Sequence, residues 1–523
     1  MKKLLAMVLL LSLLCTGVAS ASVLGTYPVS DEVINLTGWG ILAEFATIDN
    51  FSENSAMQEL ERITGVHVDW ECVTQDGCAE KRALRLAQGD LPDIFFRAAL
   101  TNEEVASLAS AGQLVDLAPM LEQYAPNFSA LMEQDPTIRL SIEDADGAIY
   151  SLPQVTTYVL TTHPIINTTW LENVGLEMPT TIDEYYNALV AFKEQDANGN
   201  GDPDDEIPLS ATGLARLYDL MAAFGVYPRN EYGMFVYPGT SEMQCSYIAD
   251  GMKDALIFFN KLYTEGLLDA ETFAQDNDML TAKGTANRLG SLVVDGAFVN
   301  VGNELHWDYA GMAAFPDANG NAYTNQRSSC SGNQFAITTN CENPEAALAY
   351  VDYLYSEDGT TLAWLGVEGE TWEWIDDEKT TWDWIMPSED TSINELRHNS
   401  TIQGGTGYPS AHPVWFESDM WAHQADEIEG SLDTDQFRMP LTDCGVLLLP
   451  TFKWTVEESE TISFILPDCS TYFTSRAVDF ITGVSDIEAE WDEYVDTMKS
   501  MGIEEGIAIY QEAYDNYMAK LNG

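Results

Sequence analysis

Basic residues are scarce in this chain of 523 residues. Lysine and arginine together number 23 against 84 aspartates and glutamates, which gives a formal net charge of −61. Nucleic acids and anionic membranes would be repelled by such a charge, so neither is expected as a partner. The acids are interspersed with aliphatic and aromatic residues, which favours a folded chain with a solvated acidic surface over a disordered one.

Long hydrophobic runs are missing too. The apolar stretch over residues 4–14, preceded by Lys2 and Lys3, is too short to cross a bilayer. It is typical of a signal peptide, and the small residues at 19–21 predict cleavage after residue 21. Cys15 raises the alternative of a lipid anchor, but Leu14 stands where lipoprotein signals have a small residue. We therefore expect residues 1–21 to be a signal peptide and the mature chain to be exported without an anchor.

Motifs of common enzyme classes are absent. The six histidines form no His-Glu-x-x-His motif, and the sequence has no Gly-x-Ser-x-Gly, phosphate-binding Gly-x-x-x-x-Gly-Lys or dinucleotide fingerprint. Glycoside hydrolases use paired carboxylates, but with 84 acids such pairs arise by chance and do not indicate an enzyme. A binding protein without catalytic residues is therefore favoured, and a secreted carbohydrate-active hydrolase is the alternative.

Cys-x-x-Cys pairs, which would indicate a zinc site, do not occur. Disulfides are permitted in an exported chain, and free buried thiols are the alternative. Three pairs could close loops and would leave Cys245 over: Cys72 with Cys78, Cys330 with Cys341, and Cys444 with Cys469. We predict a disulfide between Cys330 and Cys341, which flank a short segment with a strand pattern at 335–337.

Strand and helix patterns alternate in the first part of the chain. Strand patterns at 33–37, 66–70 and 94–96 are separated by helix patterns that begin at Ser55 and Ala79. This alternation predicts an α/β fold with parallel βαβ units and ligands at the carboxyl ends of the strands. Trp39 and Arg97 lie just past two such ends, and Arg97 is a candidate hydrogen-bond clamp. The length predicts two or more domains.

The acidic loop over residues 196–206 is the most specific local motif. It follows a predicted helix over 182–192, and its glycines allow a tightly wrapped backbone. Calcium takes roughly six to eight oxygen ligands, and the loop offers an alternating series of them: Asp196, Asn198, Asn200, Asp202 and Asp204, followed by Asp205 and Glu206. We predict a structural calcium ion here.

Two observations bear on this prediction. The loop departs from an EF-hand, because Ile207 occupies the twelfth position and Glu206 stands one place early. The alternative is a plain surface turn. Residues 317–321 repeat the start of the motif without further acids, and we interpret that copy as such a turn.

An ordered series of short motifs resembles the bacterial extracellular solute-binding proteins, the capture subunits of sugar-type ABC importers. Residues 87–94 are similar to the family's Gln-Gly-Asp-x-Pro-Asp signature. The acidic loop resembles the calcium loop of the oligosaccharide-binding branch, including alginate-binding members. The other matching segments are 64–66, 147–153, 167–181, 260–269, 343–359 and 366–370. Little beyond residue 375 is specific.

The resemblance implies a two-lobe, periplasmic-binding-protein-like fold in which each lobe has a central sheet flanked by helices. Crossings are expected near 150–155, 295–300 and 360–370. The first lobe would comprise 22–153 and 298–365, and the second 154–297 and 366–523. A monomer would capture an oligosaccharide or related solute between the lobes and deliver it to ABC permease subunits. A peptide-binding receptor of the same fold is a further alternative.

Aromatic residues in predicted loops are the candidates for holding a sugar ring. Such rings offer flat apolar faces, and Arg97 would supply hydrogen bonds. The candidates for the cleft are Trp39, Tyr158, Trp307, Trp372 and Trp415, together with Arg97.

Overall fold

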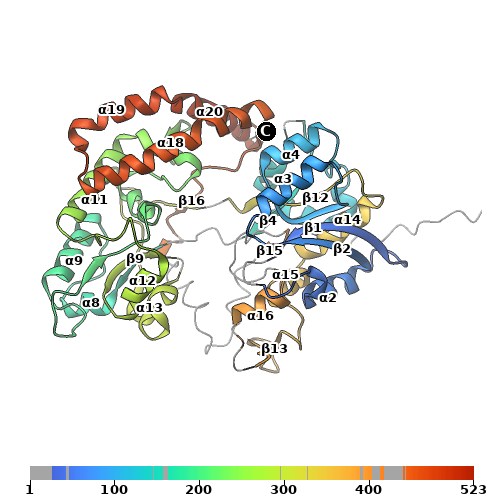
Figure 1. The fold of residues 1–523 in the computed structure, drawn as a ribbon, viewed down its shortest axis with the longest axis horizontal. Coiled ribbons are helices and arrows are strands. Elements are labelled where there is room, and N and C mark those ends of the chain that lie inside the picture. The colour runs from blue at the N-terminus through green and yellow to red at the C-terminus, as the bar shows by residue number, and fades with distance from the viewer. Residues whose placement is uncertain are drawn as a thin grey trace, which may run out of the picture.

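Two lobes, each built around its own central sheet, make up the fold (Figure 1). The computed structural model describes residues 26–42, 46–144, 146–156, 163–294, 296–326, 328–388, 391, 393–402, 413–416, 440–441 and 443–522. Within these ranges, no helix has the length and apolar character needed to cross a membrane. The expected two-lobe α/β architecture is confirmed.

The first lobe, on the right in Figure 1, contains a six-stranded sheet. β1 runs parallel to β2 and β3, as the βαβ pattern predicts, whereas β12 runs antiparallel to β3 and β4. In spatial order the strands are β15 (Trp415–Phe416), β4 (Leu152–Thr156), β12 (Cys330–Ile337), β3 (Ile94–Leu100), β1 (Ile34–Ile41) and β2 (Val66–Val73).

Helices cover both faces of this sheet. One face packs against α3 (Cys78–Gln88) and α4 (Asn102–Ser110). The other face packs against α2 (Ser55–Thr64), α5 (Leu121–Tyr124), α6 (Pro126–Gln134), α7 (Pro136–Ile142), α14 (Pro344–Asp352) and α15 (Glu357–Leu365). Local sequence sets their ends: Asn54 caps α2 by accepting a hydrogen bond from the N–H of Met57, and Gly65 ends the helix with φ +72°.

The segment after α15 packs with the first lobe, which differs from the predicted boundary at residue 366. β13 (Trp372–Trp374) and β14 (Trp382–Trp384) form an antiparallel hairpin. Its Trp372, Trp382 and Trp384 side chains lie in the same core cluster as α2 and α14, and so do side chains of α16 (Ile393–Ser400). The apolar face of the hairpin is buried against this core, so the hairpin belongs to the first lobe.

The second lobe contains a four-stranded sheet. β9 is central, because it pairs antiparallel with β5 and parallel with β6. The spatial order is β10 (Tyr309–Gly311), β5 (His163–Asn167), β9 (Leu289–Val294) and β6 (Ile207–Leu209). α12 (Asn277–Thr285) and α13 (Ala297–Leu305) cover one face. The other packs against α8 (Thr168–Asn173), α9 (Ile182–Glu194) and α11 (Asp250–Thr264).

Three C-terminal helices extend along the second lobe and reach the first (Figure 1). They are α18 (Val456–Thr482), α19 (Ile487–Ser500) and α20 (Ile503–Asn522). α18 packs on α11 and contacts α4, and α20 contacts α7. The last helix buries Ile503, Tyr510 and Tyr517 against the core, whereas Leu521 near its end is exposed. We call α18–α20 the C-terminal arm.

The order of the described strands places three connections between the lobes. The first leads from β4 to β5 and begins after Thr156, just beyond the crossing expected near 150–155, and the second leads from β10 through β11 (Thr324–Asn325) to β12. The third leads from β15 through β16 (Gly445–Val446) to α18. The crossings predicted near 295–300 and 360–370 are wrong. The apolar run 292–301 does not form one strand returning to the first lobe; it is divided between the end of β9 and the start of α13, both in the second lobe.

The seven cysteines of the described residues are all free thiols. The predicted Cys330–Cys341 disulfide is wrong, because Cys330 begins the eight-residue strand β12 and Cys341 lies beyond its end. Such a strand spans about 25 Å, whereas a disulfide joins Cα atoms within about 7 Å. Burial raises the pKa of Cys330 to about 12 and that of Cys341 to about 11.

Thiol mapping should confirm this arrangement. Unreduced, denatured protein is expected to be alkylated at both Cys330 and Cys341. Native protein should react slowly at both, because the reactive thiolate is suppressed by burial. A disulfide-linked peptide containing either residue would contradict the structure.

Candidate functional site

Strained backbone lies within β3 at the position of the predicted clamp, so Arg97 is inside the strand and the expectation that it lies just past the strand's end is wrong. Arg97 has φ +52° and Ala99 has φ +50°, a region that residues with a Cβ seldom occupy. Such strain persists where surrounding structure enforces it, and it is common at functional sites. The Arg97 side chain is 1% exposed, and its Nη1 donates a hydrogen bond of 3.2 Å to the carbonyl oxygen of Ile402.

Arg97 belongs to a basic cluster, which we define as the buried Arg97 and His398 together with the half-buried Arg397. Burial lowers the pKa of Arg97 and of Arg397 to about 10. Burial, and then the charges of Arg397 and Arg97, lower the pKa of His398 to about 4. At neutral pH the cluster therefore holds two fixed guanidinium groups beside a neutral imidazole. Guanidinium groups held in this way are pre-organised donors for hydroxyl or carboxylate oxygens.

Arg397 and His398 were not predicted as site residues, because they lie about 300 residues beyond Arg97 and outside every matched motif. The adjacent Arg-His pair was a usable signal in a chain with so few basic residues. Only the packing of α16 against the first lobe brings the pair to Arg97.

The predicted cleft aromatics that the structure describes are divided between the two lobes and differ in exposure. Trp39 is fully buried in β1, where its ring lies 6.1 Å from that of Phe95, and Trp372 is 3% exposed in the β13–β14 hairpin. The expectation that these two lie in loops is therefore wrong. Trp415 is half-buried in β15. Tyr158 lies outside the described residues.

Trp307 is the exception among these aromatics. It follows α13 in the second lobe, in a 3₁₀ turn over His306–Asp308, and it is 61% exposed. Its ring centroid lies 4.1 Å from that of the buried His306, which holds one side of the indole against the lobe. Much of the indole therefore remains available to a ligand.

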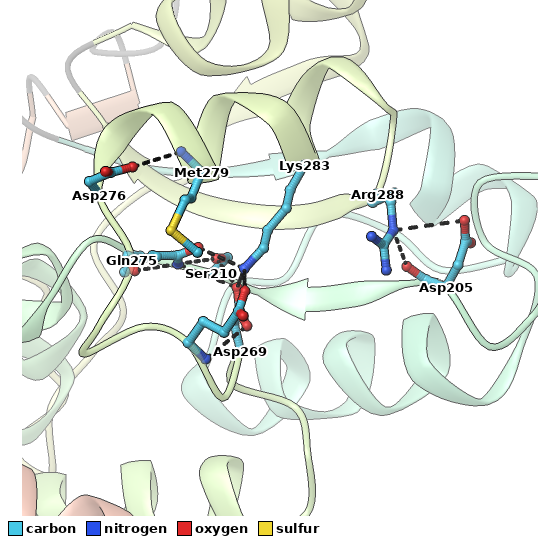
Figure 2. A network of polar contacts seen from close by, with 10 residues as sticks. Asp205, Ser210, Asp269, Gln275, Asp276, Met279, Lys283 and Arg288 are labelled. Atoms are coloured by element: carbon cyan, nitrogen blue, oxygen red, sulfur yellow. Dashed lines mark hydrogen bonds and ion pairs between the residues drawn. The ribbon is translucent and has the colours of Figure 1, made fainter.

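The acidic loop joins α9 to β6 and wraps on itself. Gly199 and Gly201 have φ values of +70° and +91°, which turn the backbone inwards. Asp205 accepts hydrogen bonds from the side-chain amides of Asn198, at 2.9 Å, and Asn200, at 3.1 Å. Arg288 Nε donates to the carbonyl oxygen of Asp205 at 3.1 Å (Figure 2). The loop is thereby anchored to the start of β9.

The structure brings the ends of the predicted ligand series together. The N–H of Asn198 donates to Glu206 Oε1 at 3.4 Å, and the N–H of Gly201 donates to Asp196 Oδ2 at 3.0 Å. Asp202 and Asp204 lie on the exposed outer turn. No group of three His, Cys, Asp or Glu side chains is gathered as a metal site in the described part of the chain. The loop would instead depend on amide and backbone oxygens as well as carboxylates.

Two carboxylate oxygens in the loop lack partners. Asp196 Oδ1 and Glu206 Oε2 are shielded from solvent and accept no hydrogen bond from described residues. Burial raises the pKa of Glu206. In the 317–321 turn, by contrast, Asp317 Oδ1 accepts from the N–H of Asn319 and of Asn321, and Oδ2 accepts from the hydroxyl of Tyr237. The second copy is thus a self-contained turn, as predicted, whereas the donor set of 196–206 fits a hard cation.

Comparison with known proteins agrees with this architecture. Residues 49–361 match the bacterial extracellular solute-binding protein family. The fructooligosaccharide ABC transporter substrate-binding protein FusA of Streptococcus pneumoniae is 26% identical over 90% of this chain and 88% of its own length. The FusA structure in complex with kestose has a TM-score of 0.74 at 25% identity, covering 93% of this chain and all of FusA. Another FusA structure is of an EF-hand mutant in complex with fructo-nystose.

Two further structures share the fold. A human-milk-oligosaccharide-binding (HMO) protein associated with an ABC transporter of Bifidobacterium longum infantis has a TM-score of 0.78 at 22% identity, over 93% of this chain and 99% of that one. The alginate-binding protein AlgQ2, in a structure without calcium ion, has a TM-score of 0.71 at 21% identity, over 94% of this chain and all of that one. Because the family match spans more than half of the sequence, the chain belongs to the bacterial extracellular solute-binding protein family.

Proposed function

We propose that this chain is the exported solute-binding component of an ABC transporter and that it captures an oligosaccharide between its lobes. The observation that carries the proposal is the match to FusA, which extends over 90% of this chain and is accompanied by the same fold. The chain would act as a monomer, perform no chemistry and deliver its ligand to permease subunits.

Each lobe contributes one part of the proposed site. The first lobe offers the Arg97 cluster, whose guanidinium groups would donate to sugar oxygens. The second lobe offers Trp307, whose exposed ring would stack on a sugar face. Tyr158 and Trp415 remain predictions for the same cleft. Closure would follow because ligand contacts on both lobes favour the closed form over the open one.

We further propose that the 196–206 loop holds one calcium ion with a structural role. The support is the pair of shielded, unpaired oxygens on Asp196 and Glu206, and the EF-hand named for FusA. Asn198, Asn200 and Asp205 would complete the site, with Asp202 and Asp204 at its outer turn. Because the loop joins α9 to β6, the ion would order one edge of the second sheet.

A binding screen with product analysis tests the proposed function. Kestose, alginate oligosaccharides, milk oligosaccharides and short peptides are each added to the purified chain, and the melting temperature is measured. At least one oligosaccharide should raise the melting temperature and be recovered intact. Shortened sugar products would favour the hydrolase alternative, and a response to peptides alone would favour the peptide receptor.

A further inference from the structure

The described residues at the connections between the lobes are hydrogen-bonded to one another, and we call these connections the hinge. Thr156 ends β4, where the first connection begins, and its N–H donates to the carbonyl oxygen of Ser329, the last residue before β12, at 2.7 Å. β11 of the second connection pairs in parallel with β16 of the third. The second connection is therefore bonded both to the start of the first and to the third.

Asn333 lies where this hinge enters the first lobe. It sits in β12 beside Gly332, which has φ +68°, and at a register shift in the pairing with β3. A bulge of this kind re-aims a side chain. Asn333 is 3% exposed, and its Nδ2 donates to the carbonyl oxygen of Leu100 at 3.1 Å and to Asn102 Oδ1 at 2.9 Å. Its amide is thereby fixed to the end of β3.

The Oδ1 atom of Asn333 accepts hydrogen bonds from two other segments. Ser151, immediately before β4, donates through Oγ at 2.6 Å. Lys453, in the third connection just before α18, donates through Nζ at 2.6 Å. One amide oxygen thus joins the start of β4, within the first lobe, to the third connection, while Asn333 itself follows the second.

The Lys453 side chain connects the C-terminal arm to the first lobe. Residues 454 and 455 separate it from α18, so its side chain ties the base of the C-terminal arm to the first lobe. Burial lowers the pKa of Lys453, and the nearby carboxylate of Asp144 acts in the opposite direction. A desolvated ammonium loses much more than an exposed one when its acceptor is removed. Separating Lys453 from Asn333 is therefore unfavourable unless water or another acceptor replaces the amide.

A second polar contact joins the arm to the first lobe, and it is an exposed ion pair. Lys520 on α20 lies 3.7 Å from Glu143, just past α7, and the Lys520 side chain is 43% exposed. Exposed ion pairs of this type contribute little. The link through Lys453 is consequently the better-defined polar attachment of the arm to the first lobe.

We propose that the Lys453–Asn333 hydrogen bond is the pivot of the hinge. The lobes turn about this point, the bond is kept in both open and closed forms, and it limits the range of lobe angles in the absence of ligand. Lys453 is then a positioning residue that touches no solute. The inference depends on the two-lobe fold and goes beyond the identity of the solute.

Inter-lobe distances in the ligand-free protein test the pivot. Spin labels are placed at Leu84→Cys on α3 and Val484→Cys after α18, both at exposed positions, with the partly exposed Cys72, Cys78 and Cys444 replaced by serine. Lys453→Met should broaden the distribution of label distances measured by electron double resonance, while each lobe remains folded. Lys453→Arg, which keeps a charged donor, should restore the narrow distribution.

Lys283→Met is the matched control. Lys283 Nζ donates to Asp269 Oδ2 and Gln275 Oε1, each at 2.7 Å, and all three residues lie within the second lobe (Figure 2). This variant should lower the melting temperature and leave the distance distribution unchanged.

The pivot is overturned if Lys453→Met changes only the melting temperature and leaves the distribution as narrow as in the parent. If Lys453→Met does not fold, Lys453→Gln replaces it, since a neutral amide keeps polarity and shortens the reach to Asn333. The distance measurement needs no ligand, so it tests the pivot independently of the proposed function. A failure to find any oligosaccharide that binds would refute the proposed function but would not change the distance distributions.

Discussion

Removal of calcium is expected to lower the melting temperature of the purified chain by roughly 5 °C, which corresponds to about 3–4 kcal/mol at a calcium concentration far above the dissociation constant. The physical reason is that the shielded Asp196 Oδ1 and Glu206 Oε2 atoms have no hydrogen-bond donor among the described residues. Without a cation, like charges face one another in a tight loop. Differential scanning calorimetry of metal-stripped protein, with and without added calcium, gives the measurement.

The chain contains its own control for this prediction. Asp196→Asn should remove most of the calcium-dependent part of the stability. Asp317→Asn changes the equivalent residue of the second copy, whose carboxylate is already satisfied by Asn319, Asn321 and Tyr237. It should leave the calcium-dependent part unchanged. Identical melting curves with and without calcium in the parent protein would contradict the calcium site.

Trp39→Ala and Trp307→Ala are expected to have opposite consequences. Trp39 is fully buried against Phe95, so its truncation should lower the free energy of unfolding by about 3–5 kcal/mol. Trp307 is 61% exposed, and its truncation should change stability by less than about 0.5 kcal/mol. It should instead weaken oligosaccharide binding by about 1–3 kcal/mol, the range for loss of an aromatic that stacks on a planar ligand.

Chemical denaturation and titration calorimetry on both variants separate these effects. Trp372→Ala offers a second buried control, because its indole Nε1 donates to the carbonyl oxygen of Gly366 within the first lobe. If Trp307→Ala binds oligosaccharide as tightly as the parent, the exposed indole does not belong to the site.

The parallel strands β1, β2 and β3 were predictable because each carries a strand pattern beside an amphipathic helix. The position of Trp39 was not. The strand pattern predicted an end at residue 37, before the glycines that flank Trp39, yet β1 continues to Ile41. A Cβ at Gly38 would lie 2.5 Å from the Trp70 ring, and one at Gly40 would lie 2.5 Å from the Phe51 ring. These glycines therefore permit close packing between aromatic side chains and a strand, and only the tertiary structure reveals this.

The course of the chain after residue 365 was equally hard to infer. The tryptophans of β13 and β14 alternate as in any half-buried hairpin, and nothing in that period indicates which lobe will cover them. The acidic loop was more accessible, because its ligand spacing and glycines are local properties. The Arg97 cluster was predictable in part. Arg97 was predicted from the strand pattern before it, whereas the positions of Arg397 and His398 depend on how α16 packs against the first lobe.

The most direct test of the account is small-angle X-ray scattering during titration with an oligosaccharide that calorimetry shows to bind. We expect the radius of gyration to fall with occupancy, the sugar to be recovered unchanged, and Trp307→Ala to shift the transition to higher sugar concentration. A saturating ligand that leaves the scattering profile unchanged would contradict capture between two closing lobes.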